Sequence, residues 1–294
     1  MKIFLTGASG FIGRNIKESF LASKYKLVCP THAQLDLLDQ DSVDAFFRRH
    51  KYFDAVIHAA VRPGHRNAKD PSGELYHNTR MFFNLVRHKD SYGKIIVLSS
   101  GLVYDQRYYL PKMKEDYFGA HIPTDEGGLS KYIIAKYVEK MTNAVELRVF
   151  GIFGKYEDYA IRFISNAICK AVCVKAVTIK QNRKFDYIFV DDFMPILDYF
   201  INHKAKYKAY NITPYKSIEL RELAKKVIRV SGKKLPIKIA KPGIDKEYSG
   251  DNKRITEEIK DISFTSIDKA ISMLYDWYLS HCCNINNKAL CFDK

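Results

Sequence analysis

The fold is decided by the stretch Thr6-Gly7-Ala8-Ser9-Gly10-Phe11-Ile12-Gly13. It follows a short apolar segment, residues 3–6, and opens a segment with helical periodicity. Gly7 allows a tight turn, Gly10 lets a pyrophosphate approach the backbone, and Gly13 lets the helix pack closely on the strand. The free N–H groups at the start of the helix also favour an anion. The stretch therefore predicts a dinucleotide-binding turn between a first strand and a first helix.

Strand and helix signals alternate outward from this turn through the first 150 residues. Apolar strands separated by amphipathic helices are typical of βαβ units around a buried parallel sheet. We therefore predict an α/β fold with a Rossmann-type doubly wound parallel sheet. The expected strands are residues 3–6, 26–29, 55–60, 94–99 and 145–149, and the expected helices are residues 11–23, 41–49, 75–88 and 130–142.

Beyond about residue 155 the alternation is less regular, which indicates a smaller C-terminal substrate-binding lobe with crossings back to the main sheet. Its pattern predicts helices over 159–172 and 217–230 and a strand over 185–190, with Pro236, Pro242 and Gly243 as breaks. The expected division gives 1–155 and roughly 186–213 to the dinucleotide-binding domain. It gives roughly 156–185 and 214–281 to the substrate-binding lobe, and 282–294 to a flexible tail.

The net charge of +15 is the unusual bulk feature of the chain. No run of five or more basic residues occurs, so we expect no nucleic-acid partner. A positive field also favours an anionic cofactor and an anionic substrate. No apolar run reaches 18 residues, and the first residues lead straight into the glycine turn. We therefore expect no membrane segment and no secretory signal.

The six cysteines show no pairing pattern of a small disulfide-rich domain. Reduced thiols are the simpler interpretation, which predicts a cytoplasmic protein. Cys169 and Cys173 are four residues apart on an expected helix, but no other Cys or His cluster accompanies them. We expect no metal site.

Tyr-x-x-x-Lys occurs twice, at Tyr108/Lys112 and at Tyr132/Lys136. Pro111 disfavours a helix in the first copy, whereas the second copy lies in an uninterrupted helical pattern that puts both side chains on one face. A lysine ammonium beside a phenol lowers the pKa of the tyrosine. Such a tyrosine can exchange a proton with a sugar oxygen while a hydride moves.

Together these features resemble the extended short-chain dehydrogenases, the family of NAD(P)-dependent nucleotide-sugar epimerases, dehydratases and ketoreductases. The resemblance covers the chain to about residue 260 and implies a nucleotide-diphosphate sugar substrate and a homodimer. Beyond the GxxGxxG turn and the second Tyr-x-x-x-Lys, it rests on pieces in the family's order: Leu35-Asp36-Leu37, His58-Ala59-Ala60, Asn78, Ser99-Ser100, Arg148-Val149-Phe150-Gly151 and residues 185–192.

The resemblance implies a catalytic trio of Ser100, Tyr132 and Lys136, in which Ser100 orients the substrate oxygen and Lys136 also bonds the nicotinamide ribose. The family's diphosphate-binding Arg is replaced by Phe185, and the family's Asn after the fifth strand by Gly151. The residues expected at the substrate are Ser100, Asn166 and Arg183, with Lys184 and Arg162 as further replacements for the lost Arg. The residues expected at the cofactor are Gly7, Ser9, Gly10, Phe11, Ile12, Gly13, Arg14, Asp36, Leu37, Ala59, Ala60, Val61, Ser99, Tyr132, Lys136 and Phe150.

The end of the second strand bears on the choice of cofactor. An NAD site usually carries an acid there to bond the ribose 2′-hydroxyl. Here Pro30-Thr31-His32 occupies the place, and Arg14 follows the last glycine of the turn, where it is available to a 2′-phosphate. We predict NADP, with NAD as the alternative.

The dipeptide Gly101-Leu102 reduces the number of reactions that the trio is expected to catalyse. Related dehydratases carry an Asp-Glu pair at this place, and fucose synthases carry a Cys, so both reactions lack their usual acid here. The stretches 35–39 and 54–60 look closest to the ketoreductase branch. The sequence thus predicts NADPH-dependent reduction of the 4-keto group of a nucleotide-linked (6-deoxy) sugar, in surface-polysaccharide sugar biosynthesis.

Two other functions stay open. One is an NAD-dependent nucleotide-sugar 4-epimerase, which needs the same trio. The other is a non-catalytic NADP-binding regulator. Regulators of that kind tend to lose the Tyr or the Lys of the motif, and this sequence has both at Tyr132 and Lys136.

Overall fold

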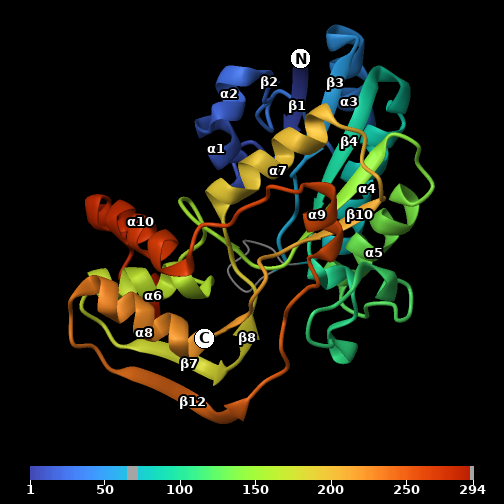
Figure 1. Cartoon of the computed structure of the whole chain (residues 1–294). Helices are drawn as coiled ribbons and strands as arrows, with labels where there is room; N and C mark the ends of the chain where they lie inside the picture. The colour runs from blue at the N-terminus through green and yellow to red at the C-terminus, as the bar shows by residue number, and fades with distance from the viewer. Residues whose placement is uncertain (65–71, 292–294) are drawn as a thin grey trace.

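The main body of the molecule is a parallel sheet of six strands in the order β10-β5-β4-β3-β1-β2, seen at the upper right of Figure 1. The structure is a computed structural model that describes residues 1–64 and 72–291. The strands are β1 (Lys2–Thr6), β2 (Lys26–Val28), β3 (Phe53–His58), β4 (Tyr92–Ser99), β5 (Ala144–Val149) and β10 (Ala209–Ile212).

Helices cover both faces of this sheet (Figure 1). On one face an apolar cluster joins the strands to α1 (Phe11–Glu18), α2 (Phe20–Lys24) and α7 (Val190–Asn202). On the other face a second cluster joins them to α3 (Gln40–His50), α4 (Glu74–Val86) and α5 (Glu126–Val138). Because both faces are covered, the strands are largely apolar on both faces, and the buried Glu146–Arg148 ion pair of β5 is an exception. The predicted doubly wound α/β fold is confirmed.

Two helices of the main body differ from their predicted ranges, and in the smaller lobe the helix expected over 159–172 begins at Phe163. The helix expected over 11–23 breaks at Ser19, whose hydroxyl caps α2 by accepting the N–H of Leu21 at 3.2 Å. The helix expected over 130–142 begins earlier, because the Asp125 carboxylate accepts the N–H of Gly128 at 2.8 Å. Two consecutive glycines are poor helix formers, which hides this first turn from a sequence pattern.

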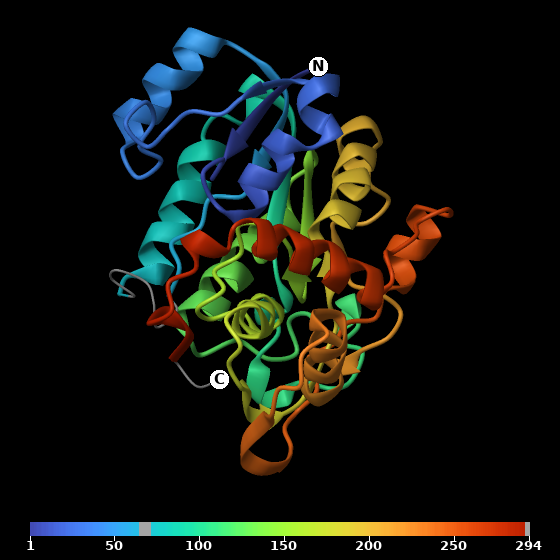
Figure 2. The same cartoon turned by 90° about the vertical axis from the view of Figure 1, so that its left-hand side faces the viewer.

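A smaller lobe lies below the sheet, and Figure 2 shows the two parts one above the other. Its apolar cluster is formed by three helices on a parallel strand pair. The helices are α6 (Phe163–Val172), α8 (Leu220–Ser231) and α10 (Ile267–Ser280), and the strands are β7 (Val177–Asn182) and β12 (Ile237–Ile244). Between the two parts run β6 (Ile152–Phe153) with β9 (Ile188–Phe189), β8 (Lys184–Phe185) with β11 (Ile218–Glu219), and α9 (Lys253–Glu258). Single 3-10 turns lie at Lys89–Ser91, Gly101–Val103, Gln106–Tyr108, Glu115–Tyr117, Cys282–Asn284 and Ala289–Cys291.

The lobe departs from the predictions in two places. The strand expected over 185–190 is split into β8 and β9, and the β7–β12 pair was not predicted. Pro242 and Gly243 lie inside β12, where a proline is tolerated because β12 pairs on one side with β7 alone among the described strands.

The predicted flexible tail needs correction over residues 282–291. The side chains of Ile285 and Leu290 are buried in the core of the smaller lobe. The N–H of Asn286 also donates to the Tyr159 hydroxyl at 2.8 Å. Apolar burial therefore fixes this segment, which the sequence pattern alone did not reveal. Among the described residues no helix is long and apolar enough to cross a membrane.

Candidate active site

The glycine turn has the shape that a dinucleotide requires. Gly7 has φ +67°, and a Cβ there would lie 2.6 Å from the carbonyl carbon and oxygen of Ala59. A Cβ on Gly13 would lie 2.2 Å from the Gly7 carbonyl oxygen. No side chain caps α1 and no acid stands in its first turn, so its first N–H groups face outward without a competing carboxylate. The turn fits a pyrophosphate.

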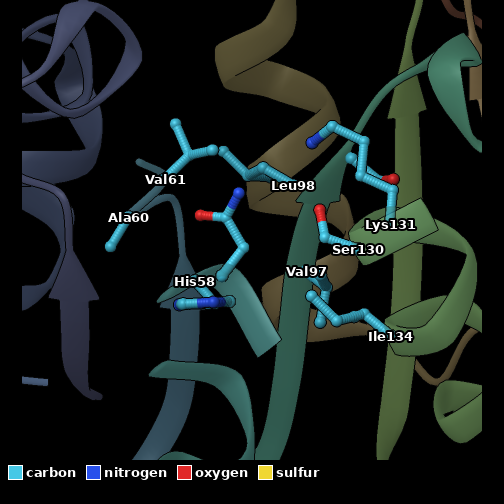
Figure 3. A pocket seen from close by; sticks show the side chains of 10 residues that line it. His58, Ala60, Val61, Val97, Leu98, Ser130, Lys131 and Ile134 are labelled. Atoms are coloured by element: carbon cyan, nitrogen blue, oxygen red, sulfur yellow. The ribbon is translucent and has the colours of Figure 1, made fainter. Parts of the chain in front are cut away.

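A pocket opens at the carboxyl ends of β3 and β4, the edge where open parallel sheets bind ligands. In Figure 3 the residues of β3 and the loop after it form one wall, and α5 forms the other. Three predicted cofactor residues, Ala60, Val61 and Ser99, line it. The remaining lining residues are His58, Asn78, Val97, Leu98, Ser130, Lys131 and Ile134.

Hydrogen bonds fix the β3 wall. The Thr6 hydroxyl accepts the N–H groups of Ala59 and Ala60 at 3.1 Å each, which leaves its own proton for Nδ1 of His58 at 3.0 Å. This network assigns His58 as neutral with its proton on Nε2. Burial lowers the pKa of His58 to about 4, and the charge of Lys131 acts in the same direction.

Asn78 holds the loop that leaves β3. Its side-chain oxygen accepts the N–H of Arg62 at 2.7 Å, and its amide nitrogen donates to the carbonyl of the same residue at 3.4 Å. Asn78 lies on α4 and also lines the pocket. The resemblance pointed to this residue, and the structure shows that it clamps the backbone beside the pocket.

The α5 wall presents Lys131. Burial lowers the pKa of Lys131, while the carboxylates of Glu146 and Glu74 favour its charged form. The buried hydroxyl of Ser99, which also lines the pocket, has no hydrogen-bond partner among the described residues. A buried hydroxyl without a partner is available to a polar ligand.

The comparisons with known proteins agree with this geometry. Residues 3–213 match the family described as the NAD dependent epimerase/dehydratase family. The chain belongs to this family. It is 26% identical over 283 residues to the GDP-L-colitose synthase of Yersinia pseudotuberculosis, covering 83% of this chain and 89% of the relative. It is 32% identical over 151 residues to a GDP-L-fucose synthase of Azorhizobium caulinodans, covering 48% of each.

Solved structures of the same fold overlay nearly the whole chain. A GDP-6-OMe-4-keto-L-xylo-heptose reductase from C. jejuni superposes with a TM-score of 0.82 at 20% identity, covering 95% of this chain and 98% of the other. The UDP-glucose 4-epimerase of Thermotoga maritima superposes with a TM-score of 0.81 at 18% identity, covering 96% and 99%. At such identities the likeness establishes the fold.

The structure does not bring the predicted family pair Tyr132 and Lys136 to the pocket. The Lys136 ammonium bonds Glu139 at 3.2 Å and lies 4.5 Å over the ring of Phe118. The Tyr132 ring packs against the same Phe118 at 5.0 Å. Each helical residue turns by about 100°, so Lys136 projects almost opposite to the side of α5 that carries Lys131. Neither residue lines this pocket, but the Lys136 ammonium lies 5.7 Å from the Tyr132 ring, so the two side chains are neighbours and their catalytic role stays a prediction.

Of the two serines after β4, the first one lines the pocket. Ser99 faces it, whereas the Ser100 hydroxyl caps the following turn by accepting the N–H of Leu102 at 3.3 Å. A Cβ on the next residue, Gly101, would lie 2.6 Å from the Phe150 ring and 2.8 Å from the Tyr248 hydroxyl. The place where related dehydratases carry an acid thus has no room for one in this packing.

The other predicted cofactor residues lie around the glycine turn and the end of β2. Arg14 is exposed, and its guanidinium stacks 3.9 Å over the Tyr156 ring. The Asp36 carboxylate accepts the N–H of Leu38 at 2.9 Å, which closes a local turn. Leu37 is buried in the core between the sheet and α3. Ser9, Gly10, Phe11 and Ile12 lie in the turn and the start of α1.

The predicted substrate residues in the second half lie outside the lining of this pocket. Asn166 is buried on α6, and its amide donates to the Tyr159 carbonyl at 2.9 Å. Arg183 lies over the rings of Phe185 and Tyr248, and its nearest acid is Asp245 at 3.8 Å. The Arg183 Nε is buried and has no hydrogen-bond partner among the described residues, so it is available to an anion. The Asn166 amide, by contrast, already donates to a backbone carbonyl.

The sequence interpretation missed Lys131 because it selected the lysine by the Tyr-x-x-x-Lys spacing. The direction in which each side of the helix faces could have been used instead. One side of α5 carries Ser130, Lys131, Ile134 and Val138, and its apolar residues pack on the sheet. No group of three or more potential metal ligands is gathered within residues 1–64 and 72–291.

Proposed function

We propose that this protein reduces the 4-keto group of a nucleotide-linked 6-deoxy sugar with NADPH, in the cytoplasm and for surface-polysaccharide synthesis. The observation that carries the proposal is the carboxyl edge of the sheet, where the dinucleotide turn and the unpartnered Ser99 hydroxyl both lie. Three of the four proteins named above are GDP-sugar synthases or reductases and the fourth is a UDP-glucose 4-epimerase, which supports a GDP-linked substrate.

Different residues of the chain have different roles in the proposed reaction. Gly7 and Gly13 admit the pyrophosphate, and Lys131 and Ser99 donate hydrogen bonds inside the pocket. A nicotinamide dinucleotide, when bound, supplies the hydride. Gly101 leaves no side chain after Ser100 to act as a second acid, so proton transfer at one carbon is the chemistry available. That limitation favours simple reduction over dehydration.

The end of β2 supports NADP over NAD. The backbone N–H and hydroxyl of Thr31 bond the Gln34 side chain at 2.9 and 3.1 Å, and Pro30-Thr31-His32 contains no carboxylate. A 2′-phosphate therefore meets no repulsive acid in this segment, and Arg14 is exposed nearby in the sequence of the turn.

The test mixes the protein with NADPH and a freshly made GDP-linked 4-keto-6-deoxy sugar. One NADPH is consumed per sugar reduced, and NADH supports a rate at least tenfold lower. A protein that arrives with tightly bound NAD and equilibrates C4 epimers without added cofactor is the 4-epimerase instead. That result would overturn the reductase proposal.

One observation favours a second candidate, a non-catalytic NADP-binding regulator. The motif residues Tyr132 and Lys136 are not among those that line the pocket at the carboxyl edge of the sheet. This candidate predicts NADPH binding without turnover of any 4-keto sugar nucleotide.

A further inference from the structure

Positive charge gathers at one end of the molecule. The strand pair β7–β12 lies at the end of the smaller lobe away from the main sheet, and Figures 1 and 2 both show it at the bottom of the view. Residues 174–184 and 233–244 contain this pair and the turns that lead into it, and every charged side chain in them is basic. The net charge of +15 is therefore not spread evenly over the surface.

Four exposed lysines of these stretches, which we call the basic strip, are Lys180, Lys234, Lys238 and Lys241. Within residues 1–64 and 72–291 none of the four forms an ion pair. Asp245, the first acid after the strip, has its carboxylate 3.8 Å from the Arg183 guanidinium. The charge of the strip is therefore not neutralised by direct pairing.

Exposed aliphatic side chains lie at both ends of the strand pair. Val174, in the turn before β7, is 66% exposed, and Ile244, at the end of β12, is 63% exposed. Val174 also has a φ of +56°, which a β-branched residue rarely adopts. Its turn costs backbone energy, and its exposed side chain gains little packing in return. Two aliphatic groups thus flank the lysines and face water in the free protein.

The strand β12 keeps this surface open along its length. It pairs with β7 on one side and with no other described strand. Every residue from Lys238 to Ile244 is exposed. Pro242 has no N–H to donate, and lysines at a sheet edge discourage a further strand from pairing there. The surface therefore suits a broad partner better than another β-strand.

The chemistry of the strip favours an anionic lipid surface over a nucleic acid. Residues 174–184 and 233–244 contain no Phe, Tyr or Trp, so they offer no ring that can stack on a base. The exposed cations are ammonium groups on flexible stems, whereas the guanidinium fork is the group that reads base edges and phosphates in pairs. Lysines beside exposed aliphatic side chains suit a bilayer surface, where charges meet headgroups and aliphatic groups enter the interface.

We propose that the β7–β12 end of this protein binds reversibly to the surface of an anionic phospholipid bilayer. The ammonium groups of the basic strip contact the anionic headgroups, and Val174 and Ile244 enter the interface. In Figure 1 α6 and α8 lie between the strand pair and the main sheet, so the pocket at the carboxyl edge of that sheet faces away from the membrane. Membrane binding of this kind does not depend on the reductase function proposed above.

Cosedimentation with vesicles tests the proposal on the full chain. In about 0.1 M NaCl we expect binding to phosphatidylcholine vesicles with about 30% phosphatidylserine to be about tenfold tighter than to pure phosphatidylcholine. In about 0.5 M NaCl most of the binding is lost, because salt screens exposed charges. Ile244→Ser, which leaves the charge unchanged, lowers the affinity about threefold, because less apolar surface leaves water.

A triple variant of the strip combines Lys234→Gln, Lys238→Gln and Lys241→Gln. Each lysine near an anionic surface contributes a factor of about five to the affinity, so the three changes together weaken vesicle binding about 10²-fold. NADPH affinity, followed by the fluorescence of the cofactor, stays within about twofold, because these lysines lie outside the lining of the pocket.

The matched control removes the same charge from the other end of the molecule. Lys89→Gln, Lys140→Gln and Lys204→Gln change exposed lysines that precede β4, β5 and β10, at the amino edge of the main sheet. We expect this variant to keep vesicle affinity within about threefold. An equal loss in the two triple variants overturns the proposal, because net charge alone then explains the binding.

Three further results would overturn the proposal. One is a wild type that does not prefer anionic vesicles. Another is tighter binding to DNA than to these vesicles, lost in the strip variant, which would assign the surface to nucleic acid. The third is aggregation of the strip variant when the wild type binds no vesicles, which would show that the lysines protect the edge of β12. A protein without reductase activity leaves all of these measurements valid, so the two proposals fail separately.

Discussion

Each side of α5 carries a lysine, and the surroundings of the two lysines differ. On one side Lys131 lines a pocket and burial lowers its pKa. On the other side Lys136 is paired with Glu139 and lies over Phe118, with 43% of its side chain exposed. Both lysines stand on the same helix, five residues apart, and only Lys131 lines the pocket.

The difference teaches that spacing and phase are separate pieces of information. An i, i+4 spacing guarantees that two side chains share a face, but it does not say which face is turned toward the sheet. The phase comes from the apolar residues of α5: Ile134 and Val138 pack in the core beside the sheet, and they lie on the side of Lys131. The pair that satisfies the motif, Tyr132 and Lys136, packs on Phe118 instead.

The largest effect is expected from Lys131→Met. The methionine fills the same volume without the ammonium, so turnover falls by about 10²- to 10⁴-fold, as for loss of a positioned catalytic group, and NADPH binds more weakly. The fold survives, because removing a desolvated charge relieves a burial cost. Steady-state kinetics, NADPH titration and thermal unfolding measure the three quantities.

Lys136→Met is the matched variant on the other side. It removes an exposed ion pair that contributes at most about 0.5 kcal/mol, so turnover and NADPH affinity stay within twofold. If Lys136→Met abolishes turnover and Lys131→Met does not, the comparison is reversed and the spacing of the motif was the better guide.

Much of the fold could be predicted because its signals are local. The glycine turn, the apolar strands and the helices between them all follow from residues close in sequence, and five of the six strands of the main sheet lie where they were expected. The β7–β12 pair could not be predicted in this way, because Val177–Asn182 and Ile237–Ile244 are far apart in the chain and β12 contains a proline.

The site was predicted in part, for the same physical reason. The turn around Gly7 and the strand end at Ser99 are fixed by local sequence, and the structure places both at the edge where ligands bind. Lys131 was missed because a helix start hidden by Gly127-Gly128 obscured the phase of α5.

Phe118→Leu tests the side of α5 that carries Lys136, and its main expected effect is on stability. The Phe118 ring lies 4.4 Å from the Arg148 guanidinium and 4.5 Å from the Lys136 ammonium, so the change removes two cation–π contacts. We expect the free energy of unfolding to fall by about 1–2 kcal/mol, measured by urea denaturation. NADPH affinity stays within twofold, and a tenfold loss of affinity would show that this side also serves the site.

Among these variants, Tyr132→Phe is expected to change the free energy of unfolding least. The ring keeps its contact with Phe118, and the hydroxyl that is removed has no hydrogen-bond partner among the described residues. A substitution of this kind changes stability by less than about 0.5 kcal/mol. Turnover with NADPH and the 4-keto sugar nucleotide, measured on the same variant, tests the predicted catalytic role of Tyr132.

The same variant also tests the sequence interpretation. If Tyr132 is catalytic, turnover falls by orders of magnitude, and if the chemistry lies on the Lys131 side of α5, turnover is nearly unchanged. If Tyr132 were the proton donor, its loss would reduce turnover by about 10²- to 10⁴-fold while NADPH still bound. Rotation of α5 on ligand binding, large enough to turn Tyr132 to the pocket, would have to expose Ile134 and Val138, which are buried in the core. Exposing two such side chains costs about 3–6 kcal/mol, so the phase of α5 is fixed by its apolar face. A near-normal rate in Tyr132→Phe, together with a large loss in Lys131→Met, assigns the chemistry to the side of α5 that faces the sheet.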